Sequence, residues 1–141
     1  MKRFFIVLVV ALLAVAAACN QSKNQADVLQ TGLNSIHAPI DTLVLSPQLS
    51  QDARQAAASL YPVVDASAIH PANGWDFPSR HFLLKAVSIN GDSAHVVGML
   101  GPVPSPRPNF GLLACGSSVD ITLQRNSSGG WQVTQTNETV C

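Results

Sequence analysis

The fold is decided by the stretch VDITLQRNSSGGWQVTQT, residues 119–136. Apolar and polar residues alternate on both sides of the turn-forming residues 126–130, and a period of two is typical of strands with one buried face. The apolar residues of the two runs share one face: Val119, Ile121, Leu123, Trp131 and Val133. The stretch therefore predicts an antiparallel hairpin that packs one face into a core.

A second hairpin is predicted upstream. Residues 81–89 and 94–100 are rich in apolar and β-branched side chains, and they flank the segment Asn90-Gly91-Asp92-Ser93. Asn-Gly between two such runs is a strong signal for a tight hairpin turn. We therefore expect four antiparallel strands in two hairpins.

The register of the last hairpin leads to a prediction about two cysteines. Pairing that starts at the turn and continues without a break places Ile121 opposite Gln135. The same register places Cys115 opposite Cys141. Directly opposed residues have Cα atoms about 4.5–5.5 Å apart, within the range of a disulfide. We therefore expect a Cys115–Cys141 disulfide that closes the open end of the hairpin.

Two helices are predicted before the hairpins. The apolar residues of the first recur on a single helical face: Val28, Leu29, Leu33 and Ile36. Pro39 prevents this helix from continuing beyond about His37, because the residue before a proline disfavours helical geometry. The helix is therefore expected to bury one face and to end near residue 37.

The second helix is expected to begin with Ser46 as its N-cap and Pro47 at its first position, and Pro62 ends it. Its apolar stripe is rich in alanine: Leu49, Ala53, Ala56, Ala57 and Leu60.

Residues 40–45, between the two helices, fit either a helix extension or a strand. Helices first and hairpins after, without βαβ alternation, predict an α+β domain. We expect two N-terminal helices packed on a four-stranded antiparallel sheet built from the two hairpins.

The first residues have the pattern of an export signal. Lys2 and Arg3 precede the apolar run 4–18, which ends in small residues. At about 15 residues, the run is shorter than the roughly 20 needed to span a bilayer. We therefore expect residues 1–18 to be a signal peptide.

The segment Val15-Ala16-Ala17-Ala18-Cys19 resembles the lipobox of bacterial lipoproteins. The resemblance implies that Cys19 becomes the mature N-terminus and carries acyl chains such as palmitate. Lipoproteins most often have leucine where this chain has Ala16, and Ala16-Ala17-Ala18 also fits an ordinary A-x-A cleavage site that would release a soluble periplasmic or secreted protein. Asn20 is not the aspartate associated with inner-membrane retention, so the resemblance implies an outer membrane lipoprotein facing the periplasm.

The cysteine count favours lipidation. Three cysteines in an exported chain leave one unpaired. If Cys19 is acylated, Cys115 and Cys141 form an even pair in an oxidising compartment. The expected organisation is a signal peptide over residues 1–18, a lipidated tether over residues 19–25 and a single α+β domain over residues 26–141.

Charge excludes one class of partner. Without residues 1–18, the chain has six Lys or Arg against eight Asp or Glu, a net charge of about −2. Nucleic-acid binding depends on clustered basic side chains, and no such cluster is present. We therefore expect no nucleic-acid partner.

The Ile89–Val96 hairpin and the Val119–Gln124 strand, followed by Gly130-Trp131-Gln132-Val133, resemble exported cystatin-like and nuclear-transport-factor-like (SnoaL-like) domains. This resemblance implies a helix on a curved sheet with room for a pocket, but it implies no particular activity. Pocket enzymes of this kind use an inward Asp or His as general base. The candidates are Asp65, Asp76, His81 and His95, and no spacing singles one out.

Metal binding and cofactor chemistry are not predicted. The spacing of His70, Asp76, His81 and His95 fits no compact ligand pattern. No catalytic residue or cofactor is therefore assigned from the sequence.

Two loops are candidates for binding a partner. Residues 70–80 and 101–111 combine turn formers or alternating prolines with exposed aromatic and Arg candidates: Trp75, Phe77, Arg107 and Phe110. Alternatively, the aromatic residues cap the core and the prolines protect an edge strand.

The first hypothesis is a membrane-tethered, non-enzymatic binding or interaction domain with an envelope protein as partner. The alternatives are an inhibitor or immunity-type lipoprotein against a cell-wall-acting enzyme, and a small-pocket enzyme or ligand carrier. A pocket lined by inward polar residues would favour the last.

Overall fold

The computed structural model describes residues 21, 23–69, 80–103 and 115–140. Several predicted features lie outside these ranges and stay predictions: the signal peptide, Cys19, Cys141, His70, Trp75, Asp76, Phe77, Arg107 and Phe110. Within the described ranges, no helix is both long enough and apolar enough to cross a membrane.

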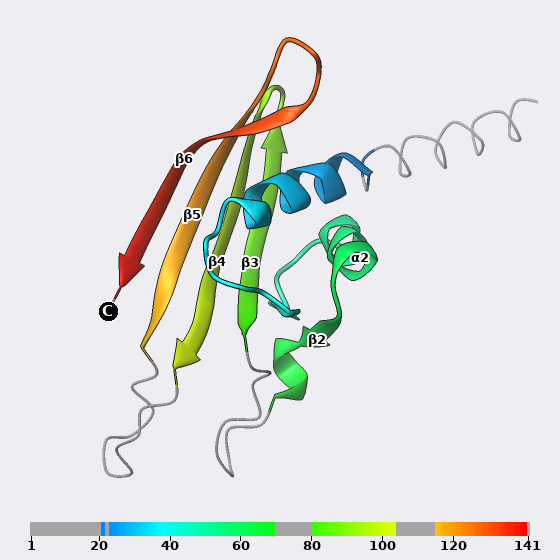
Figure 1. Cartoon of the computed structure of the whole chain (residues 1–141). Helices are drawn as coiled ribbons and strands as arrows, with labels where there is room; N and C mark the ends of the chain where they lie inside the picture. Colours follow the sequence, from blue (N-terminus) through cyan, green and yellow to red (C-terminus); the bar gives the residue numbers. More distant parts are fainter. Residues whose placement is uncertain (1–20, 22, 70–79, 104–114, 141) are drawn as a thin grey trace, which may run out of the picture.

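The structure is an α+β domain with a six-stranded mixed sheet (Figure 1). The strands are β1 (Thr42–Leu45), β2 (Val63–Asp65), β3 (His81–Asn90), β4 (Ser93–Val103), β5 (Cys115–Arg125) and β6 (Trp131–Val140). Their order in the sheet is β2-β1-β3-β4-β5-β6. Strands β3 to β6 are antiparallel, as the two predicted hairpins require, whereas β1 runs parallel to both β2 and β3.

The expected four-stranded sheet is therefore wrong, because β1 and β2 extend it. Strand β1 resolves the open assignment of residues 40–45, and its Leu43, Val44 and Leu45 are all buried. A short run of buried residues has no alternating pattern and cannot be distinguished from a helix segment by periodicity. Strand β2 spans only Val63–Asp65, directly after Pro62, and is too short to show a period.

The helix over residues 23–34 buries Val28, Leu29 and Leu33, as predicted. It already includes residues 24 and 25, and Gln25 is only 7% exposed. Residues 23–25 of this helix belong to the segment that was expected to be the tether, residues 19–25. This part of the helix is polar, so no apolar periodicity marks it.

Helix α2 (Gln51–Leu60) begins later than expected. Its N-cap is Ser50, whose hydroxyl accepts a hydrogen bond from the Ala53 amide at 3.2 Å. The predicted cap, Ser46, instead accepts from the Leu49 amide at 3.2 Å through its carbonyl and closes a turn. The Ser46 hydroxyl also accepts a hydrogen bond, from the Gln48 amide at 3.3 Å, but the turn that follows Ser46 is not part of the helix, which begins after Ser50. The predicted alanine face is confirmed, since Ala53, Ala56 and Ala57 are buried.

The β5–β6 hairpin contains a β-bulge that the predicted register lacks. Pairing starts at the turn as expected and brings Leu123 opposite Val133. Gln135 then lies opposite Thr122, which leaves Thr134 as an extra residue. The predicted pairing of Ile121 with Gln135 is therefore wrong.

Beyond the bulge, Ile121 lies opposite Thr136. The unbroken register that placed Cys115 opposite Cys141 therefore does not hold along the described part of β6. Cys141 itself lies outside the described residues, so the disulfide stays a prediction without that support.

The core lies between one face of the sheet and the two helices, and the 23–34 helix lies across the long strands (Figure 1). Packing is close at Gly98 in β4, where a Cβ atom would stand 2.3 Å from the ring of the fully buried Phe82. Phe82 can occupy this site only because residue 98 has no side chain. The Phe82 ring of β3 therefore lies directly against the β4 backbone at residue 98.

Candidate functional site

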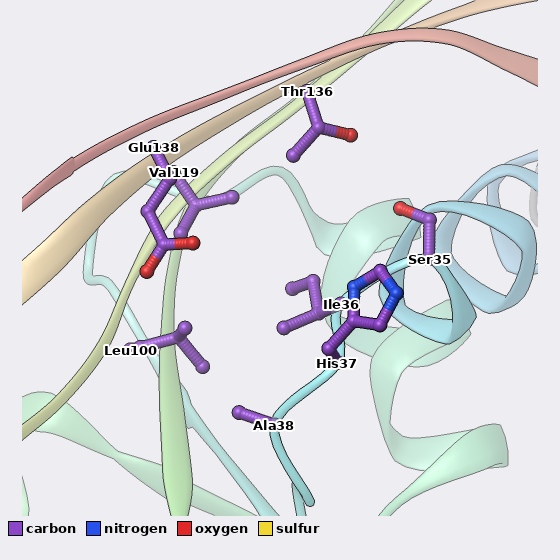
Figure 2. A pocket seen from close by; sticks show the side chains of 8 residues that line it. All are labelled: Ser35, Ile36, His37, Ala38, Leu100, Val119, Thr136 and Glu138. Atoms are coloured by element: carbon purple, nitrogen blue, oxygen red, sulfur yellow. The ribbon is translucent and has the colours of Figure 1, made fainter.

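The described residues form a pocket between the end of the 23–34 helix and strands β4, β5 and β6 (Figure 2). Its volume is about 340 Å³. The lining residues come from the helix end and from the three strands: Ser35, Ile36, His37, Ala38, Leu100, Val119, Thr136 and Glu138. A cavity of a few hundred Å³ has the size of a small-molecule site.

Of the eight lining side chains that the structure describes, four are apolar and four are polar. The apolar side chains are Ile36, Ala38, Leu100 and Val119. The polar side chains are Ser35, His37, Thr136 and Glu138. Figure 2 shows the Glu138 carboxylate on the sheet side and the His37 ring on the side of the helix end. The pocket therefore offers polar groups on two sides of apolar surface.

The bulge at Thr134 determines which β6 side chains reach the pocket. Thr136 lies opposite Ile121, and Glu138 lies opposite Val119. Directly opposed residues project from the same face of a sheet, and Ile121 and Val119 belong to the core face. Thr136 and Glu138 therefore share the face that carries the core.

The helix end supplies the other wall. The Ser35 hydroxyl donates to the Gly32 carbonyl at 2.7 Å, and the Ile36 amide donates to the Leu33 carbonyl at 3.1 Å. These bonds satisfy carbonyl groups that a helix leaves open at its C-terminus. They also fix the direction in which Ile36 and His37 leave the helix.

The opposite end of the same helix is held at the tip of the β5–β6 hairpin. The Asn24 side-chain oxygen accepts hydrogen bonds from Trp131 Nε1 at 3.0 Å and from Arg125 Nη2 at 3.2 Å. The Arg125 guanidinium lies over the Trp131 ring, 4.4 Å from its centroid. Asn24 thus fixes one end of the helix, and the residues that follow its other end line the pocket.

None of the described residues proposed as a general base lines the pocket. His95 is exposed on the other sheet face, opposite Ser88, with Nδ1 3.6 Å from Asp120 Oδ1. Asp65 forms an ion pair with Arg54 at the β2 edge.

His81 is buried, and its ring lies against Gly101, where a Cβ atom would stand 2.6 Å away. Across the described ranges, no three His, Cys, Asp or Glu residues gather as a metal site. The sequence-based candidates are therefore dispersed and not brought together.

The sequence reasoning missed every residue that lines the pocket. His37 was considered only as the end of a helix, and Glu138 was not considered at all. Glu138 is five residues after Val133, and no local pattern marks the bulge between them. The alternation of apolar and polar residues in the hairpin is the pattern that predicts which side chains face the core. Beyond Thr134 it predicts the wrong face, because the bulge reverses the alternation.

Comparison with known proteins gives little further information. The sequence matches no protein-family model, and no curated protein matches it. Among solved structures, the chain is similar to an NTF-2-like protein of unknown function from Silicibacter pomeroyi DSS-3, with 10% sequence identity. The similarity covers 92% of this chain and 98% of that chain at a TM-score of 0.31. A TM-score this low carries no argument about function.

Proposed function

We propose that this chain is a non-enzymatic, membrane-tethered domain of the cell envelope that binds a small ligand in the pocket of Figure 2. The observation that supports ligand binding is the lining itself. Apolar surface from Ile36, Leu100 and Val119 lies beside the polar groups of His37, Thr136 and Glu138. Small-molecule sites combine these two features, since apolar contact supplies affinity and a few polar groups orient the ligand.

A binding role is favoured over catalysis by the surroundings of the two titratable groups in the lining. His37 and Glu138 are both exposed. Catalytic acids and bases are usually positioned by neighbouring groups and partly removed from water. Neither side chain has such a partner among the described residues, so the pocket is better suited to holding a ligand.

The tether is supported by the sequence of Met1–Cys19 alone. An acylated Cys19 would place the domain at the outer membrane, facing the periplasm, with the lipid bilayer as its permanent partner. Mass spectrometry of the mature N-terminal peptide tests this part, and an unmodified Cys19 thiol would contradict it. Binding of an envelope protein through Trp75, Phe77, Arg107 and Phe110 stays a separate prediction.

The pocket can be tested by filling it. Ala38 is exposed and lines the pocket, so a tryptophan at this position would occupy the cavity without entering the core. Ala86 in β3 is also exposed but does not line the pocket, so Ala86→Trp is the matched control. Both variants should retain the dispersed amide spectrum of the wild type.

The assay is a titration of the mature domain with a panel of small neutral, cationic and anionic compounds, followed by NMR. We expect at least one compound to shift the signals of Ile36, Leu100 and Thr136 in the wild type and in Ala86→Trp. Ala38→Trp should abolish these shifts. A panel that leaves these signals unchanged, or shifts that persist in Ala38→Trp, would contradict the proposed site.

A further inference from the structure

We propose that the ligand is a small organic cation, an amine attached to an apolar group, whose positive charge pairs with Glu138. This inference rests on the proposed function, because it names the ligand class of the same pocket. It is argued from the charge of the lining, the pairing of the other ionic groups and the position of the apolar surface.

Glu138 is the only carboxylate among the described residues that line the pocket. The bulge turns it toward the core face, opposite Val119, so its charge stands beside apolar surface. Among the residues that the structure describes, no Lys or Arg lines the pocket and Glu138 forms no ion pair. Its charge therefore has no protein counter-ion within the described part of the chain.

Glu138 differs from the three aspartates that pair with an arginine. The three described arginines each pair with an aspartate elsewhere: Arg54 with Asp65, Arg80 with Asp41, and Arg125 with Asp92. Lys23 and Lys85 are exposed outside the pocket. The three described arginines thus lie outside the pocket, and the carboxylate of Glu138 gives the described lining a negative charge.

The remaining lining groups suit the other parts of an amine ligand. Leu100 and Val119 lie on the strand side with Glu138, so an apolar group joined to the ammonium can contact them (Figure 2). The Thr136 hydroxyl can accept a second hydrogen bond from the ammonium group. Charge-assisted hydrogen bonds to a carboxylate are stronger than neutral ones, which favours an amine over an alcohol of the same shape.

Three matched compounds test the inference: phenethylamine, phenethyl alcohol and hydrocinnamate. They share a phenyl ring on a short chain and differ in the charge of the head group. Each is titrated at millimolar concentrations into the mature domain, with the amide signals of Leu100, Val119 and Thr136 as the readout. We expect the wild type to bind phenethylamine more tightly than phenethyl alcohol, and hydrocinnamate most weakly.

Glu138→Gln removes the charge and keeps the shape of the side chain. Because the carboxylate is exposed, we expect affinity for phenethylamine to fall roughly fivefold, with no change for phenethyl alcohol. Asp27→Asn is the control, since Asp27 is an exposed acid of the 23–34 helix outside the pocket and its replacement changes the net charge equally. This control should bind phenethylamine as the wild type does. Added salt should weaken only the amine.

The outcomes separate this inference from the proposed function. Equal binding of the amine and the alcohol, unaffected by Glu138→Gln, would overturn the cationic ligand and leave the pocket as a binding site. Equal weakening by Glu138→Gln and Asp27→Asn would also overturn it, because the effect would then follow net charge alone. If none of the three compounds shifts the pocket signals while another compound of the panel does, the cationic ligand is overturned and the binding site stands. If no compound of the panel shifts them, both proposals are overturned.

Discussion

The two ends of the β5–β6 hairpin have the same strands but opposite environments. At the tip, Trp131 is 9% exposed, bonded to Asn24 and covered by Arg125. Beyond the bulge, every described residue of β6 is exposed, and Glu138 has no ionic partner among the described residues. The comparison shows that the tip fixes the helix on the sheet, while the far end leaves polar side chains available. We therefore expect substitutions at the tip of the hairpin to change stability, and substitutions at its far end to change ligand binding.

The largest expected effect comes from removing the tryptophan at the tip. Trp131→Ala should lower the free energy of unfolding by about 3 kcal/mol, because a buried ring, its hydrogen bond and its contact with Arg125 are lost together. Thr136→Ala, at the pocket end, should change it by less than about 0.5 kcal/mol. Urea denaturation of the mature domain measures both. Similar losses of the free energy of unfolding in the two variants would contradict the proposal that the tip, and not the pocket end, determines stability.

A smaller effect is expected at the helix side of the same contact. Asn24→Ala leaves Trp131 Nε1 and Arg125 Nη2 without their acceptor, which should cost about 1–2 kcal/mol. Asn24→Asp keeps an acceptor and adds a negative charge beside Arg125, so its stability should stay close to that of the wild type. Thermal unfolding of both variants checks this. An aspartate as damaging as the alanine would show that the shared acceptor is not what holds the helix.

The smallest change in the free energy of unfolding is expected from a substitution in the 23–34 helix, which runs from the hairpin tip to the pocket. Gly32 is helical, and a Cβ atom there would lie 3.4 Å from Val96 Cγ2 and 3.8 Å from Ile121 Cδ1, which is contact without overlap. Gly32→Ala should therefore raise the free energy of unfolding by about 0.5 kcal/mol. Denaturant unfolding measures the gain, and the NMR signals of Thr136 and Glu138 should not move. A destabilised variant would mean that the helix lies closer to the sheet than described.

Local patterns in the sequence predicted a large part of this fold. The alternation in residues 119–133 gave the last hairpin, and Asn90-Gly91 gave the other. The apolar face of the 23–34 helix and the alanine face of α2 were also predicted. These features depend on neighbouring residues, so the sequence contains the signal for them.

Features that depend on distant partners were not predicted. Strand β1 needs β3 beside it, and its parallel partner β2 follows only after α2. The N-cap was misplaced because Ser46 and Ser50 both precede suitable first turns, and the hydroxyls of both accept a backbone hydrogen bond. The pocket depends on the β6 bulge, which the alternation of β6 does not reveal. Candidate site residues chosen by chemical type alone, such as His95, therefore fell on the wrong face.

The bulge at Thr134 also has a consequence for how the chemistry of the pocket is encoded. Beyond it, the even-numbered residues Thr136 and Glu138 face the cavity, whereas an unbroken strand would present Gln135 and Asn137. Whether the even-numbered or the odd-numbered residues of β6 face the cavity thus decides whether it contains a carboxylate or an amide. A related chain could keep the carboxylate after losing one residue at the bulge, or exchange it for an amide by straightening the strand, without any substitution in the lining.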